Sequence, residues 1–150
     1  MKRVVALLFA IVSAACADAP PAATSGAHVA IFFEPGSETP KVTSKDAMAY
    51  FIEKYAQETK HSGRSPDVNV VGHSDATGDA TANEKLSLRR AAAVADLLVK
   101  GGIPHDRLKV SGRGAHDPLV MVGPSSNAQE RADAFDQNRR VEIELVSRPY

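Results

Sequence analysis

The side chains best suited to chemistry gather in one short loop, residues 72–78, which follows a run of valines. Between its two glycines the loop carries His73, Ser74 and Asp75. It follows a predicted strand, and loops at the carboxyl ends of strands in open α/β sheets usually carry function. These residue types allow either nucleophilic attack by the serine or recognition of a charged ligand by the aspartate.

One hypothesis makes Ser74 the nucleophile of a small serine hydrolase, held on a sharp turn between a strand and a helix. Such a turn needs a helix immediately after the serine, whereas the sequence predicts that the next helix starts only near Asn83. The chain after Ser74 is also too short for the large parallel sheet of these hydrolases, and the later histidines, His105 and His116, lie in polar turns. The hydrolase is therefore the weakest alternative, and we expect the chain not to be an enzyme.

The other hypothesis joins Asp75 to Arg90, which lies two turns into the following helix. The intervening loop lets that helix pack back beside the strand, so both side chains are expected to line one pocket. A carboxylate beside a guanidinium recognises a zwitterion, because Asp75 accepts hydrogen bonds from an ammonium and Arg90 binds a carboxylate through two hydrogen bonds. The structural alternative is a salt bridge between Asp75 and Arg90, since such pairs are common.

Composition and charge narrow the possible partners. The 150 residues include 18 basic and 18 acidic side chains, with five phenylalanines, three tyrosines and no tryptophan. A net charge of zero gives no electrostatic basis for binding nucleic acid, and few aromatic rings are available for stacking on bases. A single cysteine excludes a disulfide framework or a cysteine-rich zinc site within one chain. We therefore expect no nucleic-acid partner, no metal and no other cofactor.

The elements that position the loop follow from hydrophobic periodicity. Short apolar or alternating runs predict four strands, at residues 29–33, 68–71, 108–110 and 140–145. Apolar stripes at helical spacing predict two main helices and one short helix, at residues 44–60, 83–100 and 128–135. Thr43 or Ser44 is expected to cap the first helix, and Leu97 is expected on the buried stripe of the second. The order β-α-β-α-β-(α)-β predicts an α+β sandwich, with the two main helices packed on one face of a small mixed four-stranded sheet.

The N-terminal segment is typical of an export signal. Two basic residues precede an apolar run over residues 4–12, and small residues then lead to Cys16. The run is too short for a membrane helix, which needs about 20 apolar residues. The pattern resembles a bacterial lipobox and predicts a signal peptide at residues 1–15 with lipid attachment at Cys16; ordinary secretory cleavage after Ala15 or Ala17 is the alternative. The sequence predicts that residues 16–27 form a flexible tether and that residues 28–150 form the folded domain.

Several blocks of the chain resemble one family in both order and spacing. They are Gly72-x-x-Asp75-x-x-Gly78, Asn83-x-x-Leu86-Ser87-x-x-Arg90-Ala91, Gly101-Gly102-Ile103-Pro104, Gly112-x-Gly114 and Asn138-Arg139-Arg140-Val141-Glu142. Together they make the chain similar to the OmpA-like C-terminal domain, which is shared with the peptidoglycan-associated lipoprotein Pal and with the stators of flagellar motors. The resemblance extends over about residues 28–146, and Glu34 stands where the family often carries aspartate.

The resemblance implies non-covalent binding of the peptidoglycan stem peptide. In the family, an aspartate and an arginine that align with Asp75 and Arg90 hold the side-chain end of meso-diaminopimelate, which carries an ammonium and a carboxylate on one carbon. Ser74, Asn83 and Arg139 are implied as further ligand contacts. Two of these have structural alternatives: Asn83 as a helix N-cap, and Arg139 or its neighbour Arg140 in an ion pair with Asp136 or a strand glutamate.

The resemblance also implies a place in the cell. It predicts a lipoprotein of the cell outer membrane whose domain faces the periplasm and tethers the membrane to the cell wall. An alternative is a docking module, in which residues 115–138 bind another envelope protein.

Overall fold

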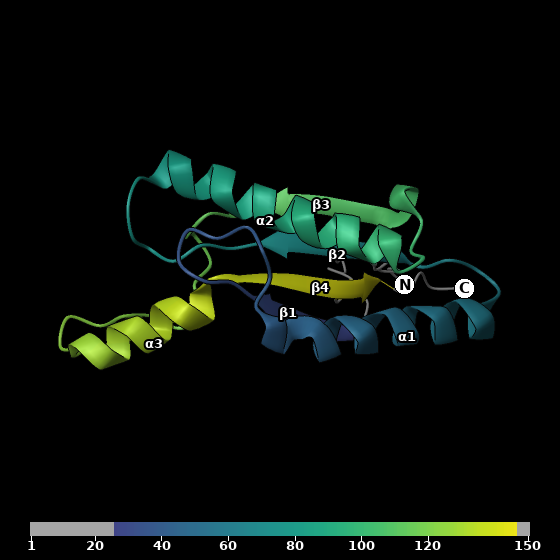
Figure 1. Cartoon of the computed structure of the whole chain (residues 1–150), viewed down its shortest axis with the longest axis horizontal. Coiled ribbons are helices and arrows are strands. Elements are labelled where there is room, and N and C mark those ends of the chain that lie inside the picture. The colour runs from purple at the N-terminus through teal and green to yellow at the C-terminus, as the bar shows by residue number, and fades with distance from the viewer. Residues whose placement is uncertain (1–25, 147–150) are drawn as a thin grey trace, which may run out of the picture.

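The computed structural model describes residues 26–146, in which two long helices cover one face of a four-stranded sheet (Figure 1). The strands are β1 (His28–Phe32), β2 (Asp67–Gly72), β3 (Leu108–Gly112) and β4 (Arg140–Val146). The helices are α1 (Lys45–Ser62), α2 (Ala80–Lys100) and α3 (Ala128–Asn138), with 3-10 turns at Val42–Ser44 and His105–Arg107. This arrangement confirms the predicted α+β fold. The proposed signal peptide and Cys16 lie outside the described residues and stay predictions.

The sheet is mixed, and its strand order is β1-β4-β2-β3. The C-terminal strand β4 lies between β1 and β2 and is antiparallel to both, whereas β2 and β3 are parallel. Val70 pairs with Ile143 in the register between β2 and β4. Because side chains alternate along a strand, these apolar residues face the helices and the polar residues of β4 face away.

The core lies between this sheet and helices α1 and α2. Phe51 and Tyr55 anchor α1, while Val94 and Leu98 anchor α2. Full burial of each large apolar side chain contributes roughly 1.5–3 kcal/mol. The expectation for Leu97 was wrong, because this side chain is 38% exposed at the edge of the buried stripe.

Two glycines bring α2 against the ends of β2 and β3. A Cβ atom on Gly72 would lie 1.9 Å from the carbonyl oxygen of Ser87, and one on Gly112 would lie 2.6 Å from the Ser87 hydroxyl. That hydroxyl accepts a hydrogen bond of 2.9 Å from the backbone N–H of Gly114. The ends of β2 and β3 are therefore held close to the first turns of α2.

The starts of α1 and α2 differ from prediction, and α1 and α3 end at Ser62 and Asn138, later than the predicted ends at residues 60 and 135. Helix α2 begins at Ala80 because the Asp79 side chain caps it, accepting from the N–H of Ala82 at 2.9 Å. At the start of α1, Ser44 makes no capping bond; its hydroxyl accepts from the N–H of Phe32 at 3.0 Å and ties the helix to β1. None of the helices within residues 26–146 is long and apolar enough to cross a membrane.

Candidate functional site

Three segments distant in the sequence meet at the carboxyl end of β2. They are the loop after β2, the loop between β1 and α1, and the junction of α3 with β4. The N–H of His73 donates to the carbonyl of Arg140 at 2.8 Å, and the N–H of Phe33 donates to the carbonyl of Arg139 at 3.0 Å. These backbone bonds hold the side chains of the predicted site at fixed positions.

Asp75 is an almost completely buried carboxylate, 8% exposed. Its Oδ2 atom accepts from Nη1 of Arg139 at 2.8 Å, and its Oδ1 atom accepts from the N–H of Thr77 at 3.0 Å and also from the Thr77 hydroxyl. Burial favours the neutral form, but the hydrogen bonds from Thr77 and Arg139 outweigh it and lower the pKa of Asp75. The carboxylate is therefore ionised at neutral pH.

Arg90 is a completely buried cation, 0% exposed. Its guanidinium donates to three backbone carbonyls: Nε to Ser37 at 2.8 Å, Nη2 to Glu34 at 3.1 Å and Nη1 to His73 at 3.3 Å. Its central carbon lies 5.1 Å from the centre of the Phe33 ring. Burial lowers the pKa of Arg90 to about 10, so the group stays charged at neutral pH although its hydrogen-bond acceptors are neutral.

The salt bridge between Asp75 and Arg90, considered as an alternative from the sequence, does not form. Arg139 takes the place of Arg90, and its Nη2 atom also donates to Asp136 at 2.9 Å. Asp136 in turn accepts from Nζ of Lys41 at 2.6 Å, and the hydrogen bond from Lys41 lowers its pKa. The predicted pairing of Arg139 with Asp136 is thus confirmed, within a longer chain of alternating charges.

Asn83 braces the site loop. Its Nδ2 atom donates to the carbonyl of Thr77 at 2.9 Å and to that of Asp75 at 3.3 Å. Since Asp79 caps α2, the alternative that Asn83 is the N-cap was wrong. The side chain holds the loop in the conformation that presents Asp75.

Ser74 is buried beside Asp75, 3% exposed, and within the described part of the chain its hydroxyl has no hydrogen-bond partner. A serine nucleophile needs a histidine within hydrogen-bonding distance, and Ser74 lacks one. His116 instead lies 3.3 Å from the carboxylate of Glu84. The geometry gives the hydrolase hypothesis no support.

His73 is a buried residue that sequence analysis left without a role. Neither ring nitrogen has a hydrogen-bond partner among the residues that the structure describes, and Nε2 lies 3.9 Å from the carboxylate of Glu142. Burial, together with the charge of Arg140, lowers the pKa of His73. Arg140 itself pairs with Glu142 at 2.7 Å, as predicted for a strand glutamate. Side chains two residues apart on a strand lie on the same face of the sheet. The position of His73 two residues after Val71 could therefore have indicated that it lies on the sheet face opposite the helices.

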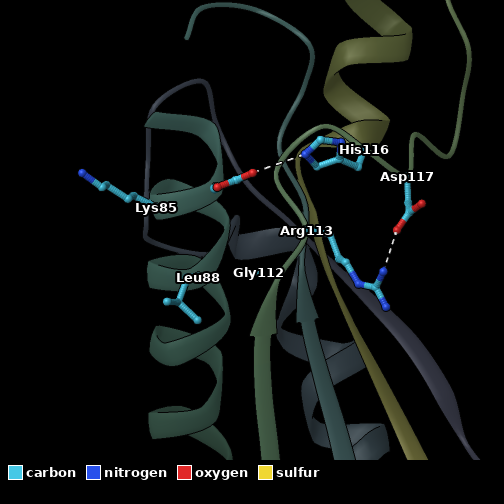
Figure 2. Close-up of a pocket in the computed structure, with 7 residues that line it drawn as sticks. Lys85, Leu88, Gly112, Arg113, His116 and Asp117 are labelled. Atoms are coloured by element: carbon cyan, nitrogen blue, oxygen red, sulfur yellow. Dashed lines mark hydrogen bonds and ion pairs between the residues drawn. The ribbon is translucent and has the colours of Figure 1, made fainter. Parts of the chain in front are cut away.

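A separate hollow of about 440 Å³ lies between α2 and the end of β3 (Figure 2). His116 contacts Glu84 of α2, Arg113 contacts Asp117 on the segment after β3, and Lys85 points outward. None of the predicted site residues lines this hollow. Within residues 26–146 no group of three or more histidine, cysteine or acidic side chains is arranged to hold a metal ion.

Comparison with known proteins identifies the family. The model of the OmpA family matches residues 32–134 of the chain. The chain belongs to the OmpA family. Over 109 residues it is 35% identical to outer membrane protein A of Escherichia fergusonii, covering 70% of this chain and 44% of that protein. The chain thus spans less than half the length of the relatives of that name, and none of these comparisons indicates a catalytic family.

Solved structures of the OmpA-like domain share the fold. The cell wall anchor of the type VI secretion system (T6SS) from Pseudomonas aeruginosa is 27% identical, with a TM-score of 0.60 over 81% of each chain. The peptidoglycan-associated lipoprotein from Burkholderia pseudomallei is 18% identical, with a TM-score of 0.61 over 78% of this chain and 87% of that one. The second likeness concerns the fold alone. The docking role predicted for residues 115–138 stays a prediction.

Proposed function

We propose that this OmpA-family chain is an outer-membrane lipoprotein whose periplasmic domain binds the peptidoglycan stem peptide and so tethers the membrane to the cell wall. The proposed contact is the side-chain end of meso-diaminopimelate, held by Asp75 and Arg90. The observation that carries the proposal is Arg90, a fully buried cation whose hydrogen-bond acceptors are all neutral carbonyls.

The charges of the site favour a ligand that carries both signs. A buried cation is costly unless it is paired, and a ligand carboxylate would give Arg90 a charged hydrogen-bond acceptor in place of neutral carbonyls. An ionised carboxylate offers about four acceptor positions, and Thr77 and Arg139 fill three of those on Asp75. The remaining position on Oδ2 suits one N–H of an ammonium.

The neighbouring residues have unequal roles in this proposal. Ser74 is a candidate ligand contact, because its buried hydroxyl has no hydrogen-bond partner among residues 26–146. Arg139 orients Asp75 and neutralises it in the free protein, and Asn83 holds the loop. We therefore assign Arg139 and Asn83 as positioning residues.

The relatives support the same proposal. A solved structure that shares this fold and is 27% identical is a cell wall anchor. The lipobox-like sequence before Cys16 supports anchoring to the outer membrane through lipid. The proposed protein is a binding module, and we assign it no reaction.

Co-sedimentation of the full chain with insoluble peptidoglycan tests this function. We expect the wild type to sediment with the polymer and the Asp75→Asn variant to remain in solution. Asp117→Asn is the matched control, since it removes the same charge from an exposed ion pair outside the site. Free meso-diaminopimelate should release the wild type. Undiminished sedimentation of a folded Asp75→Asn variant would overturn the site assignment.

A further inference from the structure

Two backbone carbonyls accept hydrogen bonds at the edge of the Arg90 guanidinium where a carboxylate could bind. The Nε and Nη2 atoms of an arginine lie on one edge, which can donate two parallel hydrogen bonds to the two oxygens of a carboxylate. In Arg90 these atoms donate instead to the carbonyls of Ser37 and Glu34, at 2.8 and 3.1 Å. Two oxygens of a single turn therefore take the positions of the two carboxylate oxygens.

The turn that supplies these oxygens is short and lies at the surface. The N–H of Ser37 donates to the carbonyl of Glu34 at 3.1 Å, and Gly36 has a φ of 67°. Pro35 followed by a glycine of positive φ is typical of a type II turn. Glu34, Pro35 and Gly36 are all exposed. The turn thus covers Arg90, and its other side-chain contacts include an ion pair of 3.5 Å between Glu34 and Lys41 and a bond of 3.0 Å from the N–H of Thr39 to the Ser37 hydroxyl.

We propose that residues 34–39, which we call the lid loop, close the site in the free protein by imitating the ligand carboxylate. Ligand binding then transfers the Nε–H and Nη2–H donors of Arg90 from the two carbonyls to the carboxylate. This inference rests on the proposed function and adds a closed state to it. Charged acceptors form stronger hydrogen bonds than neutral carbonyls, so the exchange favours the ligand.

The fixed and the movable contacts of Arg90 are distinct. Its third bond goes to the carbonyl of His73, whose own N–H is tied to β4 at 2.8 Å, so this contact stays. The lid loop is anchored at its base, where Phe33 and Pro40 form a β-bridge. Because Phe33 is fixed, the carbonyl of Glu34 leaves Arg90 only by rotation of the peptide that follows it. That rotation breaks the bond from Ser37 to Glu34 and opens the turn.

A second contact holds the lid loop shut. The carboxylate of Glu38 accepts from Nε of Arg89 at 2.6 Å, and both side chains are about half exposed. Arg89 precedes Arg90 on α2, so this ion pair joins the lid loop to the helix that it covers. An exposed pair is worth little, roughly 0.2–1 kcal/mol, and can therefore be broken when ligand arrives.

Opening variants should bind more tightly, because apparent affinity falls with the fraction of molecules that are closed. Gly36→Ala strains the closed turn through the positive φ of residue 36 and meets no neighbouring atom within 4 Å. Gly63→Ala is the matched control: Gly63 has the same φ of 67° and equally open surroundings, but it follows α1.

The experiment is calorimetric titration of the full chain with a soluble muropeptide that contains meso-diaminopimelate. We expect Gly36→Ala to lower the dissociation constant about fivefold, Glu38→Gln to lower it by a factor of about two, and Gly63→Ala and Asp117→Asn to leave it unchanged. Tight binding by the wild type with equal or weaker binding by folded Gly36→Ala would overturn the lid. No binding by the wild type or any variant would instead overturn the proposed function, and the lid with it.

Discussion

Arg139 bridges Asp75 and Asp136, which are 61 residues apart, with donor-to-acceptor distances of 2.8 and 2.9 Å. The guanidinium thereby links the loop after β2 to the end of α3. Since Lys41 continues the chain of charges to the loop between β1 and α1, the three segments of the site are joined by side chains as well as by backbone bonds.

Removing this guanidinium should destabilise the fold strongly. Arg139→Met leaves the buried carboxylate of Asp75 without its counter-charge, and breaking a buried pair costs about 3–5 kcal/mol. The free energy of unfolding in urea measures the loss. Arg113→Met breaks only an exposed pair with Asp117, so we expect a loss below about 1 kcal/mol. Equal losses in the two variants would show that the Asp75 contact is not a buried one.

Lowering the pH should reduce the free energy of unfolding, because carboxylates that are ionised in the folded protein become protonated. The pKa values of Asp75, Asp136 and Glu142 are all lowered in the folded state. The unfolded chain therefore binds protons first, and the stabilisation is complete above the ordinary carboxyl pKa of about 4 and is lost as pH falls through the lower folded values. Urea unfolding between pH 6 and 3 measures this, and Asp75→Asn should flatten the curve. An unchanged slope would contradict a lowered pKa of Asp75 in the folded state.

Because of His73, we expect the free energy of unfolding to depend on pH in a second range, which is less acidic than that of the carboxylates. Burial lowers its pKa, so below the ordinary histidine value of about 6.5 the unfolded chain takes up a proton that the folded chain refuses. Stability should thus decline as pH falls from 7 to 5. We expect His73→Gln to remove that decline, whereas His61→Gln, on the exposed end of α1, should retain it. A decline that persists in His73→Gln would assign the titration to another group.

The close approach of α2 to the sheet predicts a steric effect. Gly72→Ala places a methyl group 1.9 Å from the carbonyl oxygen of Ser87, so the helix must move. Overpacking of this kind typically costs about 1–3 kcal/mol. Gly123→Ala is the control, because its nearest neighbour is 3.8 Å away. Thermal unfolding distinguishes them: we expect a lower midpoint for Gly72→Ala alone, and equal midpoints would place the helix further from the strand.

The sequence predicted the elements of the fold better than the contacts of the site. Val141, Ile143 and Leu145 alternate with polar residues, and this periodicity is set by the strand itself, so β4 could be predicted locally. Leu97 shows the limit of predicting burial from helical spacing. Its spacing from the other apolar residues fits the buried face of α2, but around the helix axis its side chain lies at the edge of that face. The start of α2 was missed because the capping residue is Asp79, before the apolar stripe begins.

The partners within the site depend on tertiary structure. Asp75 and Arg90 share the family spacing, yet Arg139, 64 residues away from Asp75, forms its ion pair. Nothing in the local sequence indicates that the carbonyls of Glu34 and Ser37 cover Arg90, since backbone groups carry no sequence signal. The residue types of the site were therefore predictable, whereas its closed arrangement was not.

The central claim is that Asp75 and Arg90 hold the ammonium and carboxylate at the side-chain end of meso-diaminopimelate. Binding of the full chain to two soluble muropeptides tests it most directly, one with that carboxylate free and one with it converted to the neutral amide. We predict binding to the free carboxylate and a loss of at least tenfold in affinity for the amide, because a carboxamide cannot give Arg90 a charged hydrogen-bond acceptor. Equal affinity for both muropeptides would contradict the account.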